Sequence, residues 1–138
     1  MKQQLDIQVG VKALLKNKKG QFLMLKRSEK KYTDTKGRWD IVGGRILPGT
    51  ELMENLKREI MEEIGLQLIK EPILIAAQDI IRADKHVVRL TYLGVIDGKI
   101  KLDTEENSEY KWLTLDEIRA MPDLDIYLKE VLEKHSFT

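Results

Sequence analysis

The residues of this chain best suited to chemistry are three glutamates within one short stretch, REIMEEIGL at residues 58–66. Glu59, Glu62 and Glu63 are spaced at i, i+3 and i+4, so all three lie within an arc of about 100° if the stretch is helical. Carboxylates this close repel one another, and a divalent cation would reverse that interaction. Mg²⁺ and Mn²⁺ prefer such oxygen ligands. Taken alone, however, the glutamates are more typical of a solvated helix face.

The residues on either side of the glutamates decide between these interpretations. Residues 43–66 read GGRILPGTELMENLKREIMEEIGL, and residues 44–66 resemble the Nudix hydrolase signature, G-x5-E-x7-R-E-U-x-E-E-x-G-U, in which U is aliphatic. The resemblance implies a single Nudix hydrolase domain over residues 1–138. It also implies an α/β (α+β) fold, an α/β/α sandwich with a mixed sheet between helices.

The chain departs from the signature in the loop before the predicted helix. Thr50 stands where the family has its first glutamate, and Leu47 occupies a position that is often acidic. We expect the Thr50 hydroxyl to cap the helix N-terminus, with Glu51 and Glu54 complementing the positive end of the helix. The departure bears on the level of activity more than on the fold.

The resemblance assigns roles to the remaining residues of the signature. It implies that Glu59 and Glu63 bind Mg²⁺, that Glu62 binds the metal or orients water, and that the Gly44 carbonyl is a further ligand. Mn²⁺ is the expected substitute metal. Arg58 is expected to brace the carboxylates rather than to contact the reacting phosphorus.

A second acidic segment precedes Trp112 and resembles a family segment that reaches the metal site from a loop. We favour Glu106 there as an additional ligand or general base, with Glu105 and Glu109 as the competing choices. A solvated loop before a strand is the simpler alternative for all three.

Three residues outside these segments are candidates for substrate binding. By resemblance, Arg27 matches a position that contacts phosphate or nucleoside, and Arg45 matches one that assists the leaving phosphate. Trp39 has the ring to stack on a base, although a tryptophan directly before a strand is at least as often a core anchor.

Charge and composition narrow the class of partner. The 24 lysines and arginines nearly balance the 23 aspartates and glutamates, so the net charge of +1 does not favour nucleic acid. The absence of cysteine suits a reducing cytoplasm. Neither a membrane span nor a secretory signal is recognisable, so we expect a soluble cytoplasmic protein.

The elements that must position these residues can be read from hydrophobic periodicity and turn residues. A turn at residues 17–20 favours a hairpin between the first two strands. The spacing Thr114-x-x-Glu117 predicts a capping box at the start of a short helix. The other expected elements are strands at 5–15, 21–27, 39–42, 73–82, 86–96 and 109–113, the signature helix, and a closing helix at 123–135.

Three functions remain open from the sequence. The first is Mg²⁺-dependent hydrolysis of a nucleoside triphosphate, oxidised ones included, to monophosphate and pyrophosphate. The second is hydrolysis of ADP-ribose or a nucleotide sugar, and the third is a Nudix module that binds a ligand with little turnover. A homodimer is also open, because the apolar segment 73–81 suits pairing across subunits as well as pairing within one sheet.

Overall fold

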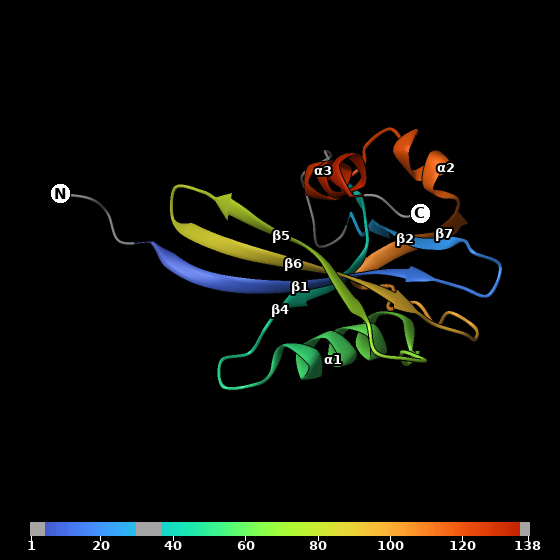
Figure 1. The fold of residues 1–138 in the computed structure, drawn as a ribbon, viewed down its shortest axis with the longest axis horizontal. Helices are drawn as coiled ribbons and strands as arrows, with labels where there is room; N and C mark the ends of the chain where they lie inside the picture. The colour runs from blue at the N-terminus through green and yellow to red at the C-terminus, as the bar shows by residue number, and fades with distance from the viewer. Residues whose placement is uncertain (1–4, 30–36, 136–138) are drawn as a thin grey trace.

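The structure, a computed structural model, describes residues 5–29 and 37–135. It contains seven strands in one mixed sheet, with α1 against one face and α2 and α3 over the other (Figure 1). The predicted class is therefore confirmed. The elements are β1 (Asp6–Lys16), β2 (Phe22–Arg27), β3 (Trp39–Asp40), β4 (Val42–Arg45), α1 (Leu52–Ile64), β5 (Ile73–Ile81), β6 (Lys85–Val95), β7 (Asn107–Leu113), α2 (Leu115–Arg119) and α3 (Ile126–Lys134).

The sheet is organised around β1, which pairs in parallel with β6 along its whole length. β5 then pairs with β6 in antiparallel orientation, and β3 and β7 both pair with β2. β1 and β2 form the predicted hairpin, but their pairing is confined to Lys16 and Phe22. Because the two strands then diverge, β4 pairs with β1 between Gly10 and Ala13. This divergence opens the sheet where Glu59, Glu62 and Glu63 of α1 lie.

The helix α1 forms where the signature predicts it, and its apolar side packs on the sheet. Leu56, Ile60 and Ile64 are fully buried there, each by an amount that stabilises the fold by about 2 kcal/mol. Gly65 ends the helix in the left-handed conformation (φ 70°), and its N–H donates to the Met61 carbonyl. The three glutamates lie on the neighbouring face of the helix.

A second hydrophobic cluster lies on the other face of the sheet, under α2 and α3. The predicted capping box at Thr114 and Glu117 is confirmed at the start of α2. The closing helix begins three residues later than predicted, because the Asp125 side chain accepts from the N–H groups of Tyr127 and Leu128 and so caps α3.

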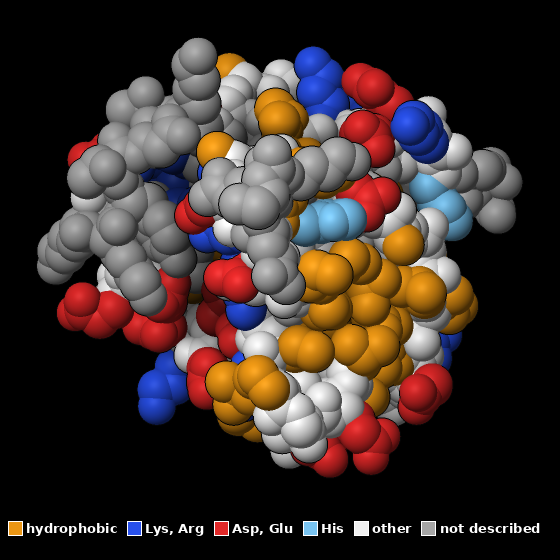
Figure 2. Space-filling model, turned by 90° about the vertical axis from the view of Figure 1, so that its left-hand side faces the viewer, with side chains coloured by type: hydrophobic (Ala, Val, Ile, Leu, Met, Phe, Trp, Pro, Cys, Tyr) orange, Lys and Arg blue, Asp and Glu red, His pale blue; other side chains and the backbone are white. Residues whose placement is uncertain are grey.

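One end of the sheet extends beyond the helices. The beginning of β1 and the turn between β5 and β6 lie there, and Figure 2 shows apolar side chains gathered on this end of the molecule. Ile7 and Ile81 are 72% and 67% exposed. No helix within the described residues is long and apolar enough to cross a membrane.

Candidate active site

A cavity of about 620 Å³ lies where β1 and β2 diverge. Its wall combines residues from the strands, from α1, from the segment before β7 and from the start of α3. Most of the predicted site residues line it, namely Arg27, Gly44, Arg45, Glu59, Glu62, Glu63 and Glu106. The fold therefore brings residues that are far apart in sequence into one space.

Glu63 is held most firmly of the three helix glutamates. Its Oε2 accepts from the Gly43 N–H at 2.8 Å, and its Oε1 lies 3.4 Å from the Asn107 amide. Burial raises the pKa of Glu63 to about 7, with a further rise from the Glu59 charge, although Lys12 and both hydrogen bonds oppose the shift. A carboxyl in this state would be stabilised in its charged form by an added cation.

Glu59 lies against the backbone of β4. A methyl group added at Gly44 would come within 2.7 Å of the Glu59 carboxyl, so glycine is the residue that leaves room for this contact. Arg58 Nη2 donates to Glu59 Oε1 at 3.1 Å, and Arg58 Nε lies 3.7 Å from Glu62 Oε1. Arg58 also reaches the Arg45 carbonyl at 3.3 Å and does not line the cavity, which is the geometry expected of a brace.

The donor set suits a hard divalent cation. Among the described residues, no three carboxylates or histidines converge closely enough to hold a metal ion without other ligands. Glu59, Glu62 and Glu63 nevertheless line the same cavity, and all their donors are oxygen atoms. Burial also disfavours the charged form of Glu63, which a neighbouring cation would stabilise. These features fit Mg²⁺, which needs only a few protein ligands when substrate phosphates complete its shell.

The predicted N-cap at Thr50 is wrong, because Thr50 bonds within the loop instead. Glu51 is the N-cap residue and makes no side-chain capping bond. The Thr50 hydroxyl donates to the Leu47 carbonyl at 2.6 Å and accepts from the amide of Asn55 at 2.8 Å. Asn55 is fully buried, and its Oδ1 accepts from the Leu47 N–H and from Arg58. The loop before α1 is thus fixed by Asn55 without the family glutamate.

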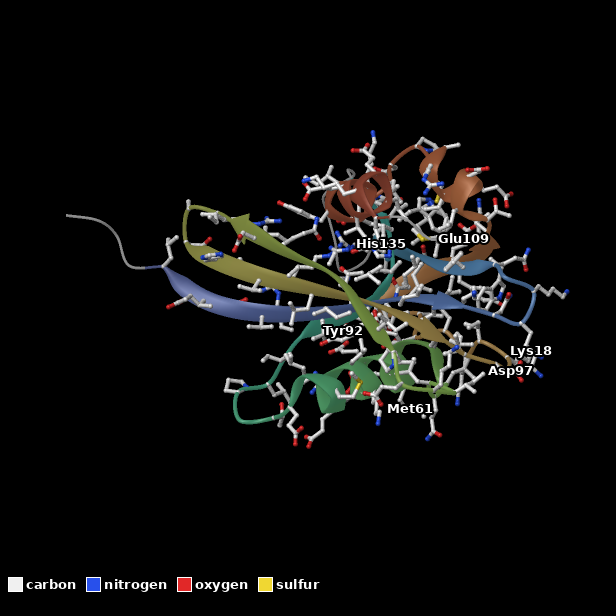
Figure 3. The ribbon with its side chains drawn as sticks, in the orientation of Figure 1. Lys18, Met61, Tyr92, Asp97, Glu109 and His135 are labelled. Atoms are coloured by element: carbon white, nitrogen blue, oxygen red, sulfur yellow. The ribbon has the colours of Figure 1, made fainter. Side chains whose placement is uncertain are left out.

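Of the three glutamates before Trp112, only one lies on the wall of the cavity. Glu106 lines the cavity, whereas Glu105 and Glu109 are exposed and lie outside its wall. Figure 3 shows Glu109 on β7, on the α2 side of the sheet and away from Met61 of α1. Glu106 is therefore the one of the three that faces the glutamates of α1 across the cavity.

Trp39 is not placed to stack on a base. It is 8% exposed, packs in the cluster under α3, and lies outside the cavity wall. The Lys111 ammonium lies 5.0 Å from the centre of its ring. The structure therefore favours the core anchor, because β3 pairs Trp39 against β2 with its ring turned toward α3.

A buried charge network forms the floor of the cavity and was not predicted. Asp40 accepts from Arg27 at 2.8 Å and from Arg89 at 3.0 Å, and it pairs with Lys12 at 3.0 Å. Burial would raise the pKa of Asp40, but these three cations outweigh it and hold the pKa well below its usual range. Arg89 also pairs with Asp125 at 3.1 Å. The available signal was a basic residue inside each of two apolar strands, at Lys12 and Arg89.

Comparison with known proteins adds independent findings. The family model for the NUDIX domain matches residues 6–134. An 8-oxo-dGTP diphosphatase of Buchnera aphidicola subsp. Schizaphis graminum is 27% identical over 105 residues, and the match covers 74% of each chain. The nucleoside triphosphatase NudI of Salmonella agona is 27% identical over 82% of this chain and 86% of its own.

Solved structures agree with the sequence comparisons. A MutT protein from Methanosarcina mazei Go1 superposes with a TM-score of 0.83 at 30% identity, covering 96% of this chain and 95% of its own. The similarity therefore extends over the elements that build the cavity as well as over the signature.

Proposed function

The chain belongs to the NUDIX domain family, and from this premise we propose that it hydrolyses a nucleoside triphosphate to the monophosphate and pyrophosphate in the presence of Mg²⁺. The observation that supports this proposal is the joining of Glu59, Glu62 and Glu63 with several arginines in one cavity. A nucleotide polyphosphate requires both environments, carboxylates for its cations and basic groups for its remaining charge. Relatives named as 8-oxo-dGTP diphosphatase and nucleoside triphosphatase support the same class of substrate.

The chemistry follows from the stability of the phosphoanhydride bond, whose charged oxygens repel a nucleophile. Mg²⁺ held by Glu59, Glu62, Glu63 and the Gly44 carbonyl would neutralise part of the phosphate charge. Arg58 keeps Glu59 and Glu62 in place through its contacts at 3.1 and 3.7 Å.

The remaining steps are assigned to cavity residues outside α1. Glu106 accepts the proton from the attacking water, because it is a carboxylate on the cavity wall that lies outside the helix cluster. Arg27, anchored 2.8 Å from Asp40, orients the nucleotide, and Arg45 binds the departing phosphate groups. Both arginines would bind phosphate oxygens through their positive charge and would take no part in proton transfer.

The alternative of a weakly active binding module is less well supported by the loop. Thr50 was the feature that motivated this alternative, but the loop keeps its bonds through Asn55. The glutamates that a binder would not need also remain in the cavity wall.

A panel of substrates tests the proposal. The purified protein is incubated with common and oxidised nucleoside triphosphates, ADP-ribose and nucleotide sugars, with Mg²⁺, with Mn²⁺ and with EDTA, and the products are separated by ion exchange. We expect monophosphate and pyrophosphate from at least one triphosphate, only with metal. Turnover confined to ADP-ribose or a nucleotide sugar would select the second function. Binding without turnover would select the binding module.

We also propose that two copies associate through β5 and that the protein acts in the cytoplasm, apart from nucleic acid. Among the described strands β5 pairs only with β6, and Ile73, Leu74 and Ile81 are 63%, 51% and 67% exposed. Such an edge is suited to pairing with a second strand. Light scattering after size-exclusion chromatography should give twice the chain mass. A monomer mass would remove the dimer from the proposal.

A further inference from the structure

Two arginines line the end of the cavity nearest the turn between β5 and β6. Neither of them has an acidic partner among the described residues. Arg45 and Arg82 both line this end, and Lys85 lines it beside them. Within residues 5–29 and 37–135, neither arginine forms an ion pair, and the Arg45 side chain donates only to the neutral amide of Gln8. The arrangement differs from the cavity floor, where Asp40 and Asp125 compensate Arg27, Arg89 and Lys12.

The fold fixes both arginines from different strands. Arg45 ends β4 and pairs with Gly10 of β1, and its Cδ lies 3.8 Å from the position that a Cβ on Gly10 would occupy. Arg45 therefore lies over the backbone of β1 beside Gly10. Arg82 follows β5, and its N–H donates to the Lys85 carbonyl at 2.9 Å, which closes the turn into β6.

The two positive charges affect each other across this space. Arg45 and Arg82 line the same cavity, so their like charges repel each other across it. Two like charges held together are unfavourable unless an anion lies between them, in which case each guanidinium supplies charge-assisted hydrogen bonds. No carboxylate of the described chain pairs with either arginine, so an anion bound between them would interact with both charges.

The two arginines lie along the cavity from the glutamates that would hold the metal ion. Arg45 directly follows Gly44, whose backbone lies against the Glu59 carboxyl, so this arginine is the next residue of β4 after the carboxylate end of the cavity. A polyphosphate that is bound at the glutamates and extends along β1 toward its N-terminus would approach Arg45 and Arg82, which line the same cavity.

We propose that Arg45 and Arg82 form an anionic subsite that selects substrates with a second charged phosphate beyond the bond that is cleaved. This inference rests on the proposed function and deepens it. A nucleoside triphosphate fills the subsite with its terminal phosphate. A nucleotide sugar places a neutral sugar there and leaves both charges uncompensated. Arg82 is thus a specificity-determining residue that the Nudix signature does not contain.

Steady-state kinetics of Arg82→Gln and Arg82→Lys test the subsite. The best triphosphate substrate is compared with a nucleoside diphosphate sugar of the same base, each with Mg²⁺. For Arg82→Gln we expect kcat/KM on the triphosphate to fall about tenfold, mainly through KM, with less than a twofold change on the nucleotide sugar. Arg82→Lys should recover part of the loss. The exposed Lys99→Gln, which removes one charge outside the cavity, should change neither value.

Two results would overturn the inference. Equal losses on both substrates, or no loss on either, would show that Arg82 does not read the terminal phosphate. Weaker inhibition by pyrophosphate in Arg82→Gln, with an unchanged kcat/KM for the triphosphate, would assign the pair to the product instead.

A binding measurement separates this inference from the proposed function. Inorganic tripolyphosphate is titrated into wild type and Arg82→Gln by calorimetry in EDTA. If wild type hydrolyses no member of the panel, the proposed function fails. Even then, an affinity for tripolyphosphate about tenfold weaker in Arg82→Gln than in wild type would support the subsite. Equal affinities would refute the subsite whatever the activity.

Discussion

The raised pKa of Glu63 predicts that the metal-free protein loses stability as the pH rises. The pKa of this carboxyl moves from 4.5 to about 7 on folding, so between these values the folded state binds more protons than the unfolded state. The free energy of unfolding therefore falls with rising pH across this window. A shift of this size corresponds to a loss of about 3 kcal/mol in the free energy of unfolding. The loss is absent below pH 4.5 and complete above about pH 7.

The substitution Glu63→Gln removes this dependence. Glutamine stays neutral, and its side-chain oxygen can still accept from the Gly43 N–H that Glu63 accepts at 2.8 Å. At pH 5 the variant and wild type should have similar stability. At pH 8.5 the variant should be more stable by about 3 kcal/mol.

Urea unfolding in EDTA at several pH values between 5 and 8.5 measures the difference. Comparison of two chains that differ at one position cancels the titration of the remaining groups. Glu62→Gln is the matched control, because the Glu62 side chain is 59% exposed and its removal should leave the slope with pH unchanged. Addition of Mg²⁺ at pH 8.5 should reduce the gap by stabilising wild type. A gap that stays constant from pH 5 to 8.5 would refute the reasoning.

Three further substitutions test the surroundings of the site. Asp40→Asn should cost about 3 to 5 kcal/mol in urea unfolding, because buried Arg89 and the partly buried Lys12 and Arg27 lose their shared anion; a cost below 1 kcal/mol would contradict the network. Asn55→Ala should lower stability by about 2 kcal/mol and turnover with it, since the loop loses its central amide; an unchanged melting temperature would count against this. Gly44→Ala should displace the Glu59 carboxyl and so raise the Mg²⁺ concentration needed for activity, while the stability of the fold stays nearly unchanged. An unaltered dependence of activity on Mg²⁺ would contradict this geometry.

Local features of the fold could be predicted from the sequence because each depends on residues close in the chain. The periodicity of α1 and its end at Gly65 are set within the signature. The capping box at Thr114 needs only Glu117, three residues later. The strands predicted at 73–82 and 86–96 agree with β5 and β6 to within one residue at each end.

The remaining features depend on pairing between distant segments. The parallel register of β1 and β6 aligns Gly10 with Arg89, and nothing in either segment specifies that alignment. The Arg89 contact of Asp40 follows from this register, whereas the position of Arg45 beside Gly10 follows from the pairing of β1 with β4. The error at Thr50 has a different origin, because a hydroxyl near a helix start can bond to the loop or to the helix, and buried Asn55 decides between them.

The most direct test of the account is the metal-dependent release of pyrophosphate from the best triphosphate by wild type and by Glu63→Gln. We predict turnover by wild type with Mg²⁺, none in EDTA, and a loss of at least a hundredfold in kcat in the variant, whose fold is retained by circular dichroism. Pyrophosphate release that persists in EDTA, or that survives the substitution undiminished, would contradict the assignment of the α1 glutamates as the metal site.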